Sequence, residues 1–200
     1  MKERLLSVMI MFSFSLFVLT QIQCSSEKKE NKKMTNEEMV ARGKYLVDFG
    51  GCNDCHSPKV MTNMGPVPDT TKLLSGHPAG EPLGAIDTTV TSSKWMYTSM
   101  DLTAWAGPWG VSFGANITPD DQTGIGTWNE DIFFKAMREG KHMGSGRPIL
   151  PPMPWQSIGQ LKDEDLRSVF AYLKSLKPIS NKVSDPIPQN MVAKASKARK

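Results

Sequence analysis

The sequence predicts an all-α domain built from three helices and one long loop-rich insertion. Two stretches, residues 35–49 and 127–139, open with a spacing typical of helix N-termini and continue with apolar residues at helical intervals. A third apolar stripe of the same period follows the acidic residues 163–165 and ends before Pro178. Between the first two, residues 57–126 are rich in glycine and proline, so we expect short strands at most there.

Composition supports one compact domain with appendages, because 200 residues with 39% apolar and 22% charged residues suffice for one core rather than two. The formal net charge is +4 at pH 7, and it is +3 once Lys2, Glu3 and Arg4 have left with a leader. This charge is far below the basic density of nucleic-acid-binding domains, so nucleic acid is not expected as a partner.

The N-terminus has the pattern of an export signal. Two basic residues precede a mainly apolar run, Leu5–Thr20, which is shorter than the roughly 20 apolar residues of a membrane-spanning helix. Residues 1–23 resemble a lipoprotein-type signal peptide that leaves Cys24 as the lipidated N-terminus, although Gln23 stands where a small residue is usual. An uncleaved anchor and cleavage at another site are the alternatives. The pattern predicts an exported protein, lipid-anchored at the periplasmic face of the membrane.

The folded domain is predicted to span residues 35–180. Residues 24–34 are mostly polar and charged, and we expect a solvated linker there. Thr35 and Glu38 have the spacing of a capping box, and an apolar stripe carries the first helix to about Phe49. Two glycines then end the helix.

The insertion is predicted to be ordered, with short strands near Thr88–Thr91 and Val111–Ile117. A loop-rich stretch of this length is unusual in a compact domain unless it serves a function. Its aromatic residues favour packing against the rest of the domain: Trp95, Tyr97, Trp105, Trp109 and Phe113.

Two further helices complete the predicted domain. Thr127–Glu130 repeats the capping-box spacing before a helix that Gly140 ends. The last helix begins at the acidic residues 163–165, which favour the positive end of its dipole. Residues 181–200 are predicted to be a loose basic tail.

The segment Cys52–His56 carries the most specific chemical pattern, because Cys-x-x-Cys-His is the attachment signature of c-type haem. Two cysteines three residues apart on a helical turn reach the two vinyl groups of one porphyrin as thioethers. The adjacent imidazole of His56 is then the proximal iron ligand. The sequence therefore predicts one covalent haem c held by Cys52, Cys55 and His56, with the insertion covering it.

Other interpretations of the two cysteines leave part of the motif unexplained. A Cys52–Cys55 disulfide or redox pair leaves His56 without a task, and a zinc site needs further ligands at matching spacing. Three cysteines in an exported chain cannot all pair, whereas one for lipid and two for haem leave none over.

The second axial ligand is expected on the loop after the central helix, where His142, Met143 and Met153 are the candidates. Prolines on both sides of Met153 impose a rigid, extended backbone that presents the side chain at little entropic cost. A weak thioether ligand needs such a support, so Met153 is predicted as the iron ligand opposite His56. A gap-filling core methionine is the alternative.

These residues resemble bacterial mono-haem class I cytochromes c and the cytochrome c subunits of membrane-bound alcohol and sugar dehydrogenases. Six stretches carry the resemblance: Cys52–His56, Asp101–Trp105, Asn116–Asp120, Thr123–Trp128, Arg147–Trp155 and Asp163–Leu176. They cover most of residues 43–180, and the chain departs from the multi-haem dehydrogenase subunits by having one haem motif.

The resemblance implies the cytochrome c fold, in which the first and last helices cross and the haem sits between them with one edge exposed. It also implies the axial pair His56 and Met153. Pro66 is implied as the carbonyl partner of the second nitrogen of His56, and Trp155 as a further neighbour of the site.

The predicted function is one-electron transfer between redox partner proteins, namely a dehydrogenase, an oxidase or a quinol-oxidising complex. The chain is then a carrier or a subunit of a dehydrogenase complex rather than an enzyme. The alternatives are a haem peroxidase or reductase, or a ligand sensor, and each needs an iron face that Met153 leaves open or vacates.

Overall fold

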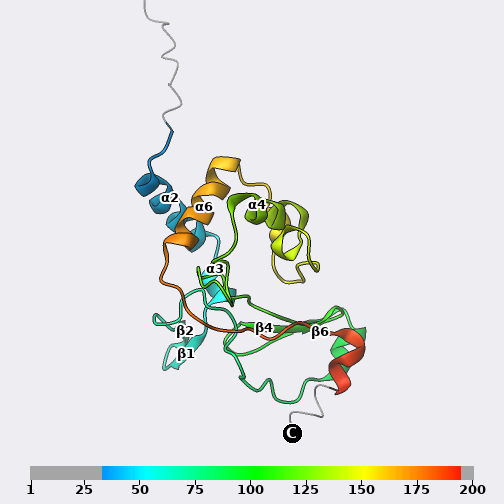
Figure 1. Cartoon of the computed structure of the whole chain (residues 1–200). Coiled ribbons are helices and arrows are strands. Elements are labelled where there is room, and N and C mark those ends of the chain that lie inside the picture. The colour runs from blue at the N-terminus through cyan, green and yellow to red at the C-terminus, as the bar shows by residue number, and fades with distance from the viewer. Residues whose placement is uncertain (1–32, 195–200) are drawn as a thin grey trace, which may run out of the picture. The chain divides into compact units, whose positions relative to one another are not determined.

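The computed structural model describes residues 33–194 (Figure 1). The predicted signal peptide at residues 1–23, the lipidation site Cys24 and the linker as far as residue 32 lie outside the described residues, as do residues 195–200. Within the described range, no helix is both long enough and apolar enough to cross a membrane.

Two helices open the described chain, most of the strands follow, and a run of helices comes before the last strand. Their bounds are α2 Asn36–Phe49, α3 Cys52–His56, β1 Lys59–Thr62, β2 Gly65–Pro68, η1 Thr88–Ser92, β3 Tyr97–Thr98, β4 Ala104–Gly107, β5 Gly110–Phe113, α4 Glu130–Glu139, η2 His142–Gly144, α5 Trp155–Ile158, α6 Asp163–Ser175, β6 Ile187–Pro188 and η3 Gln189–Met191.

Helix α2 begins at the predicted capping box. The Thr35 hydroxyl accepts a hydrogen bond from the Glu38 N–H at 3.2 Å, and the Glu38 carboxylate accepts one from the Thr35 N–H at 2.8 Å. These two bonds satisfy donors that the first turn leaves without helical partners. The helix ends at Phe49 with Gly50 as its C-cap.

The first and last helices, α2 and α6, lie side by side (Figure 1). The backbones meet at Gly43, where a Cβ atom would overlap the carbonyl oxygen of Ser168. Arg42 extends the contact by donating from Nε to the Asp165 carboxylate at 2.8 Å. Glycine is therefore required at the crossing, because any side chain would push the two helices apart.

The N-cap of the central helix, α4, lies two residues after Thr127, where the predicted capping box begins. Asn129 is the N-cap, and its side-chain oxygen accepts from the Ile132 N–H at 2.9 Å. Gly140 ends the helix in the left-handed conformation, with φ 67°, as a helix C-terminus often requires. The apolar face of α4 and those of its neighbours enclose one core: Val47, Leu74, Ile125, Phe133, Ala136, Met137, Leu166, Val169 and Leu173.

The all-α prediction is wrong, because the insertion folds into two antiparallel sheets within the described residues. Strands β1 and β2 form a hairpin, and the second sheet has the order β3-β4-β5-β6. The strands are two to four residues long, too short for an alternating pattern to stand out from the surrounding glycines and prolines. Of the two predicted strands, the one near Thr88–Thr91 lies in the 3₁₀ helix Thr88–Ser92, and only Val111–Phe113 of the one at Val111–Ile117 belongs to a strand.

The segment after the last helix is part of this sheet and not a loose tail as far as residue 194. Ile187 pairs with Val111, and Val192 is fully buried. The Asn181 amide donates to the carbonyl oxygens of Ser75 and His77 at 2.7 and 2.9 Å. A second core lies between this segment and the strands: Val90, Ala106, Val111 and Val192.

Replacing Gly43 with alanine is expected to destabilise the protein by about 3 kcal/mol, because the backbone oxygen of Ser168 cannot move away without separating α2 from α6. Denaturant unfolding of the two forms measures this difference. Ala41→Ser on the exposed side of the same helix is the control and should cost no more than about 0.5 kcal/mol. A Gly43→Ala variant as stable as the parent would contradict the close crossing.

Candidate functional site

The candidate site is centred on α3, the single helical turn that contains Cys52, Cys55 and His56. Gly51 precedes it in the left-handed conformation, with φ 65°, and so turns the chain out of α2. Both thiols are free and half-buried. Burial raises the pKa of Cys52 to about 11 and also raises the pKa of Cys55, so both are protonated thiols at neutral pH.

His56 is held in one protonation state. Its side chain is 8% exposed, and Nδ1 lies 2.7 Å from the carbonyl oxygen of Ala115. A carbonyl oxygen only accepts, so Nδ1 must carry the proton of the neutral ring. Burial lowers the pKa of His56, which keeps the imidazole neutral. The lone pair therefore resides on Nε2.

Nε2 of His56 makes no hydrogen bond to any described residue. It is also not fully enclosed, because no side-chain nitrogen or oxygen in residues 33–194 is both fully enclosed and without a partner. A buried ring with its Nδ1 bonded and its Nε2 open has the form of a metal-ligating histidine.

Segments of the insertion determine where the Ala115 carbonyl lies. The Gly114 N–H donates to the Thr103 carbonyl at 2.8 Å, and a Cβ atom on Gly114 would overlap the carbonyl oxygen of Cys55. The Gly76 N–H donates to the His56 carbonyl at 2.7 Å. The end of β5 and the loop at Gly76 therefore hold α3 directly through its backbone.

Ala115, and not Pro66, supplies the carbonyl beside His56 in the structure. Pro66 lies in β2, where it pairs with Met61 on the far strand of the hairpin. The implied partner is corrected for a physical reason: Pro66 lies beside the turn of the β1–β2 hairpin, whereas Gly114, directly after β5, lies against the carbonyl oxygen of Cys55. A single sequence contains no signal for Ala115, since a backbone carbonyl is available at every residue.

Met153 lies between α4 and α6, in the proline-framed segment predicted for it. Its half-buried side chain and that of Cys52 pack against the same helical core. The Met153 N–H donates to the Leu150 carbonyl at 3.3 Å. Trp155 packs its ring on Gly140, where a Cβ atom would collide with it, so the segment is attached to the end of α4.

The rival residues on this loop have different surroundings. The His142 ring meets the edge of Trp128 with their centroids 5.5 Å apart. Burial and the charge of Arg147 lower the pKa of His142. Met143 is 46% exposed.

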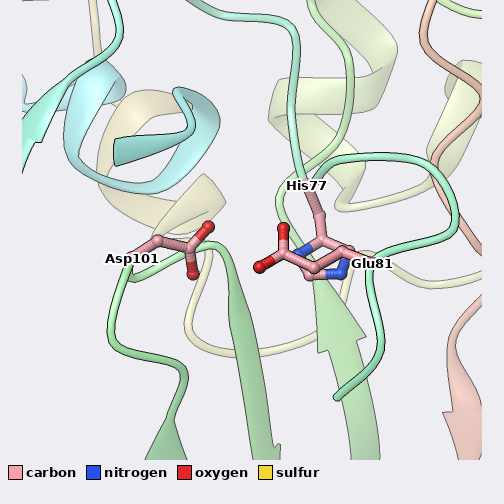
Figure 2. A group of neighbouring side chains, drawn as sticks. All are labelled: His77, Glu81 and Asp101. Carbon is pink, nitrogen blue, oxygen red and sulfur yellow. The ribbon is translucent and has the colours of Figure 1, made fainter. Parts of the chain in front are cut away.

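His77 takes part in a separate cluster with Glu81 and Asp101, which Figure 2 shows converging. One possible ligand atom from each lies within 4.8 Å of the others. Hydrogen bonds through Thr103 link two members of the cluster: the His77 Nδ1–H donates to the Thr103 hydroxyl at 2.8 Å, and that hydroxyl donates to Asp101. We interpret this network as a structural connection between two loops of the insertion.

The donor set around α3 fits a covalently attached haem. Two free thiols stand three residues apart on one turn, as thioether attachment requires, and the neutral His56 ring offers its Nε2 lone pair. Met153 provides a soft thioether beside the same core.

Comparisons with known proteins also point to cytochromes c, although no protein-family model matches the sequence. The chain is 33% identical over 160 residues, 78% of its length, to the gluconate 2-dehydrogenase cytochrome c subunit of Pantoea cypripedii. It is 36% identical over 153 residues, 74% of its length, to the fructose dehydrogenase cytochrome subunit of Gluconobacter japonicus. It is 26% identical over 153 residues, 75% of its length, to the alcohol dehydrogenase (quinone) cytochrome c subunit of Gluconobacter oxydans strain 621H.

The matched region is a part of each relative. It spans 28% of the gluconate dehydrogenase subunit and 24% of each of the other two. The resemblance predicted from the sequence motifs is confirmed: over about three quarters of its length, this chain is similar to the cytochrome c subunits of bacterial dehydrogenases.

Proposed function

We propose that the chain is an exported mono-haem c-type cytochrome that carries single electrons between a dehydrogenase and a respiratory partner. The observation that supports this most is the state of His56, a buried neutral imidazole with Nδ1 bonded to Ala115 and Nε2 open, directly beside two free thiols. When bound, haem c supplies an iron centre that gains or loses one electron.

Each residue of the site has a distinct role in the proposal. Cys52 and Cys55 attach the porphyrin as thioethers, so the group cannot dissociate. His56 is the proximal ligand, and its hydrogen bond to Ala115 keeps the ring from rotating and raises its basicity. Met153 is the second axial ligand, and a thioether there gives a higher potential than a second histidine would.

A dehydrogenase is the electron donor that the comparisons favour. The relatives are named as cytochrome subunits of gluconate, fructose and alcohol dehydrogenases, which act on different substrates. A shared electron carrier beside different substrate-oxidising subunits explains this range. The proposed acceptor is an oxidase or a quinol-oxidising complex, and the contact with either is small and transient, as is usual for redox partners.

The proposed location is the periplasmic face of the membrane, with the chain attached through lipid on Cys24. The support comes from the leader pattern of residues 1–23 and from the charged linker before α2.

Removing the thiols should separate the chain from its haem in steps. Cys52→Ala or Cys55→Ala alone should retain haem through one thioether, with a pyridine haemochrome band shifted to longer wavelength. The double variant should lose its haem to acidified acetone, because no covalent bond remains. Haem staining of denaturing gels gives the same comparison, and stain retained by the double variant would refute attachment at these residues.

Met153→Ala should abolish the weak red-edge absorption band that sulfur-to-iron charge transfer produces in the oxidised protein. It should also lower the reduction potential and allow carbon monoxide to bind the reduced form. Met143→Ala and His142→Ala are the matched controls from the same loop and should keep the band. If Met143→Ala removes the band and Met153→Ala keeps it, Met153 is not the ligand.

Mass spectrometry of the mature protein tests the anchor. The N-terminal peptide should begin at Cys24 and carry the added mass of a diacylglycerol group, and the protein should partition into detergent. Cys24→Ser should move it to the aqueous phase with its haem spectrum unchanged. A mature N-terminus at any other residue would contradict lipid attachment at Cys24.

A further inference from the structure

The second sheet contacts residues 151–154, here called the methionine segment, through one side chain. The Ser112 hydroxyl, on β5, donates to the carbonyl oxygen of Pro151 at 2.5 Å, across 39 positions of sequence. The indole N–H of Trp109 donates to the Ser112 oxygen at 3.1 Å. Both directions are certain, because a carbonyl only accepts and an indole only donates. Ser112 is 6% exposed, so little water competes for these bonds.

The strand pairing places Ser112 and Gly107 on one face of the sheet. Ser112 pairs with Trp105 and Gly107 with Gly110, so these four residues share a face. Trp109 folds back over that face at Gly107, where a Cβ atom would meet its ring at 2.5 Å. The absence of a side chain at Gly107 is what lets the indole reach Ser112.

The opposite face supports this arrangement. Ala106 and Val111 point that way and pack against Val90 and Val192 in the second core. Close packing there gives β5 a defined position, so the position of the Ser112 hydroxyl is also well defined.

Few hydrogen bonds from its own backbone hold the methionine segment. Proline occupies positions 151, 152 and 154, so Met153 is the one residue of 151–154 with a backbone N–H. The Met153 carbonyl accepts from the Trp155 N–H at 2.9 Å, and the Pro151 carbonyl accepts from the Ser112 hydroxyl. Trp155 on Gly140 fastens the other end of the segment to α4.

We propose that Trp109 and Ser112 are positioning residues that hold Met153 against the iron, and that this is a function of the insertion sheet. The proposal rests on the axial role of Met153 proposed above. A thioether is a weak ligand, and whether it stays bound depends on how far its backbone can move away. The Ser112 bond limits that movement at Pro151, two residues before the sulfur-bearing side chain.

Imidazole binding to the oxidised protein is the test, because imidazole competes with Met153 for the iron and its binding reports how often the thioether is displaced. Ser112→Ala should keep the haem and most of the charge-transfer band but bind imidazole about five-fold more tightly, the factor expected from losing one neutral hydrogen bond. Trp109→Phe keeps a ring on Gly107 without the N–H and should show a smaller increase, about two-fold.

Ser168→Ala is the matched control. Ser168 is fully buried, and its hydroxyl donates to the Glu164 carbonyl within α6, so its loss lowers stability without touching the methionine segment. The imidazole affinity of this variant should equal that of the parent. A second measurement that does not depend on the iron is hydrogen exchange at the Met153 amide, which should be about five-fold faster in Ser112→Ala.

The outcomes separate the two proposals. A parent protein whose spectrum lacks the charge-transfer band overturns the axial role of Met153 and, with it, the positioning role. A band that is present, together with imidazole affinity and Met153 exchange in Ser112→Ala equal to those in Ser168→Ala, overturns the positioning role alone.

Discussion

The hydrogen bond between His56 Nδ1 and the Ala115 carbonyl is the interaction on which the proposed site depends. It determines the tautomer of the ring and the direction in which Nε2 points, while burial lowers the pKa of His56 and keeps the ring neutral. The acceptor is a backbone atom 59 positions away along the chain. A change of side chain at residue 115 therefore does not remove the acceptor itself. The site is therefore only as well defined as the chain around residue 115, which the rest of the insertion must hold in place.

Each of the two hydrophobic cores supports a different part of the site. The helical core borders Cys52 and Met153, and thus the thiol nearest α2 and the candidate sixth ligand. The core of the second sheet supports β5, which leads directly to Ala115 and carries Ser112. Hydrogen bonds attach the chain on either side of the site to the loop at residues 74–77: the Ile117 N–H donates to the Leu74 carbonyl, and the Asn181 side chain donates to the Ser75 carbonyl. The insertion is thus a second support for the site rather than a covering alone.

Local chemistry explains what the sequence could predict. The capping box at Thr35, the end of α4 at Gly140 and the turn at Cys52–His56 depend on residues close together in the chain, and the structure has all three. The acidic start of α6 is also where it was predicted. The sequence predicts part of β5 but not the pairing of β5 with β6, because that partner is far away in the chain: Gly110 looks like a loop residue until Ile187 is placed against it. The resemblance implies Pro66 as the partner of His56, and the Ala115 carbonyl has no side-chain signature.

The crossing of α2 and α6 also orders events in time. Arg42 and Asp165 are 123 positions apart, so their contact cannot form until nearly the whole domain has been synthesised. A chain made from its N-terminus presents Cys52 and Cys55 long before residues 163–175 exist to complete the core beside Cys52. In the proposed cytochrome, attachment of the haem to these thiols would not have to wait for α6. The docking of α6 would then complete the helical core beside Cys52 after the thioethers have formed.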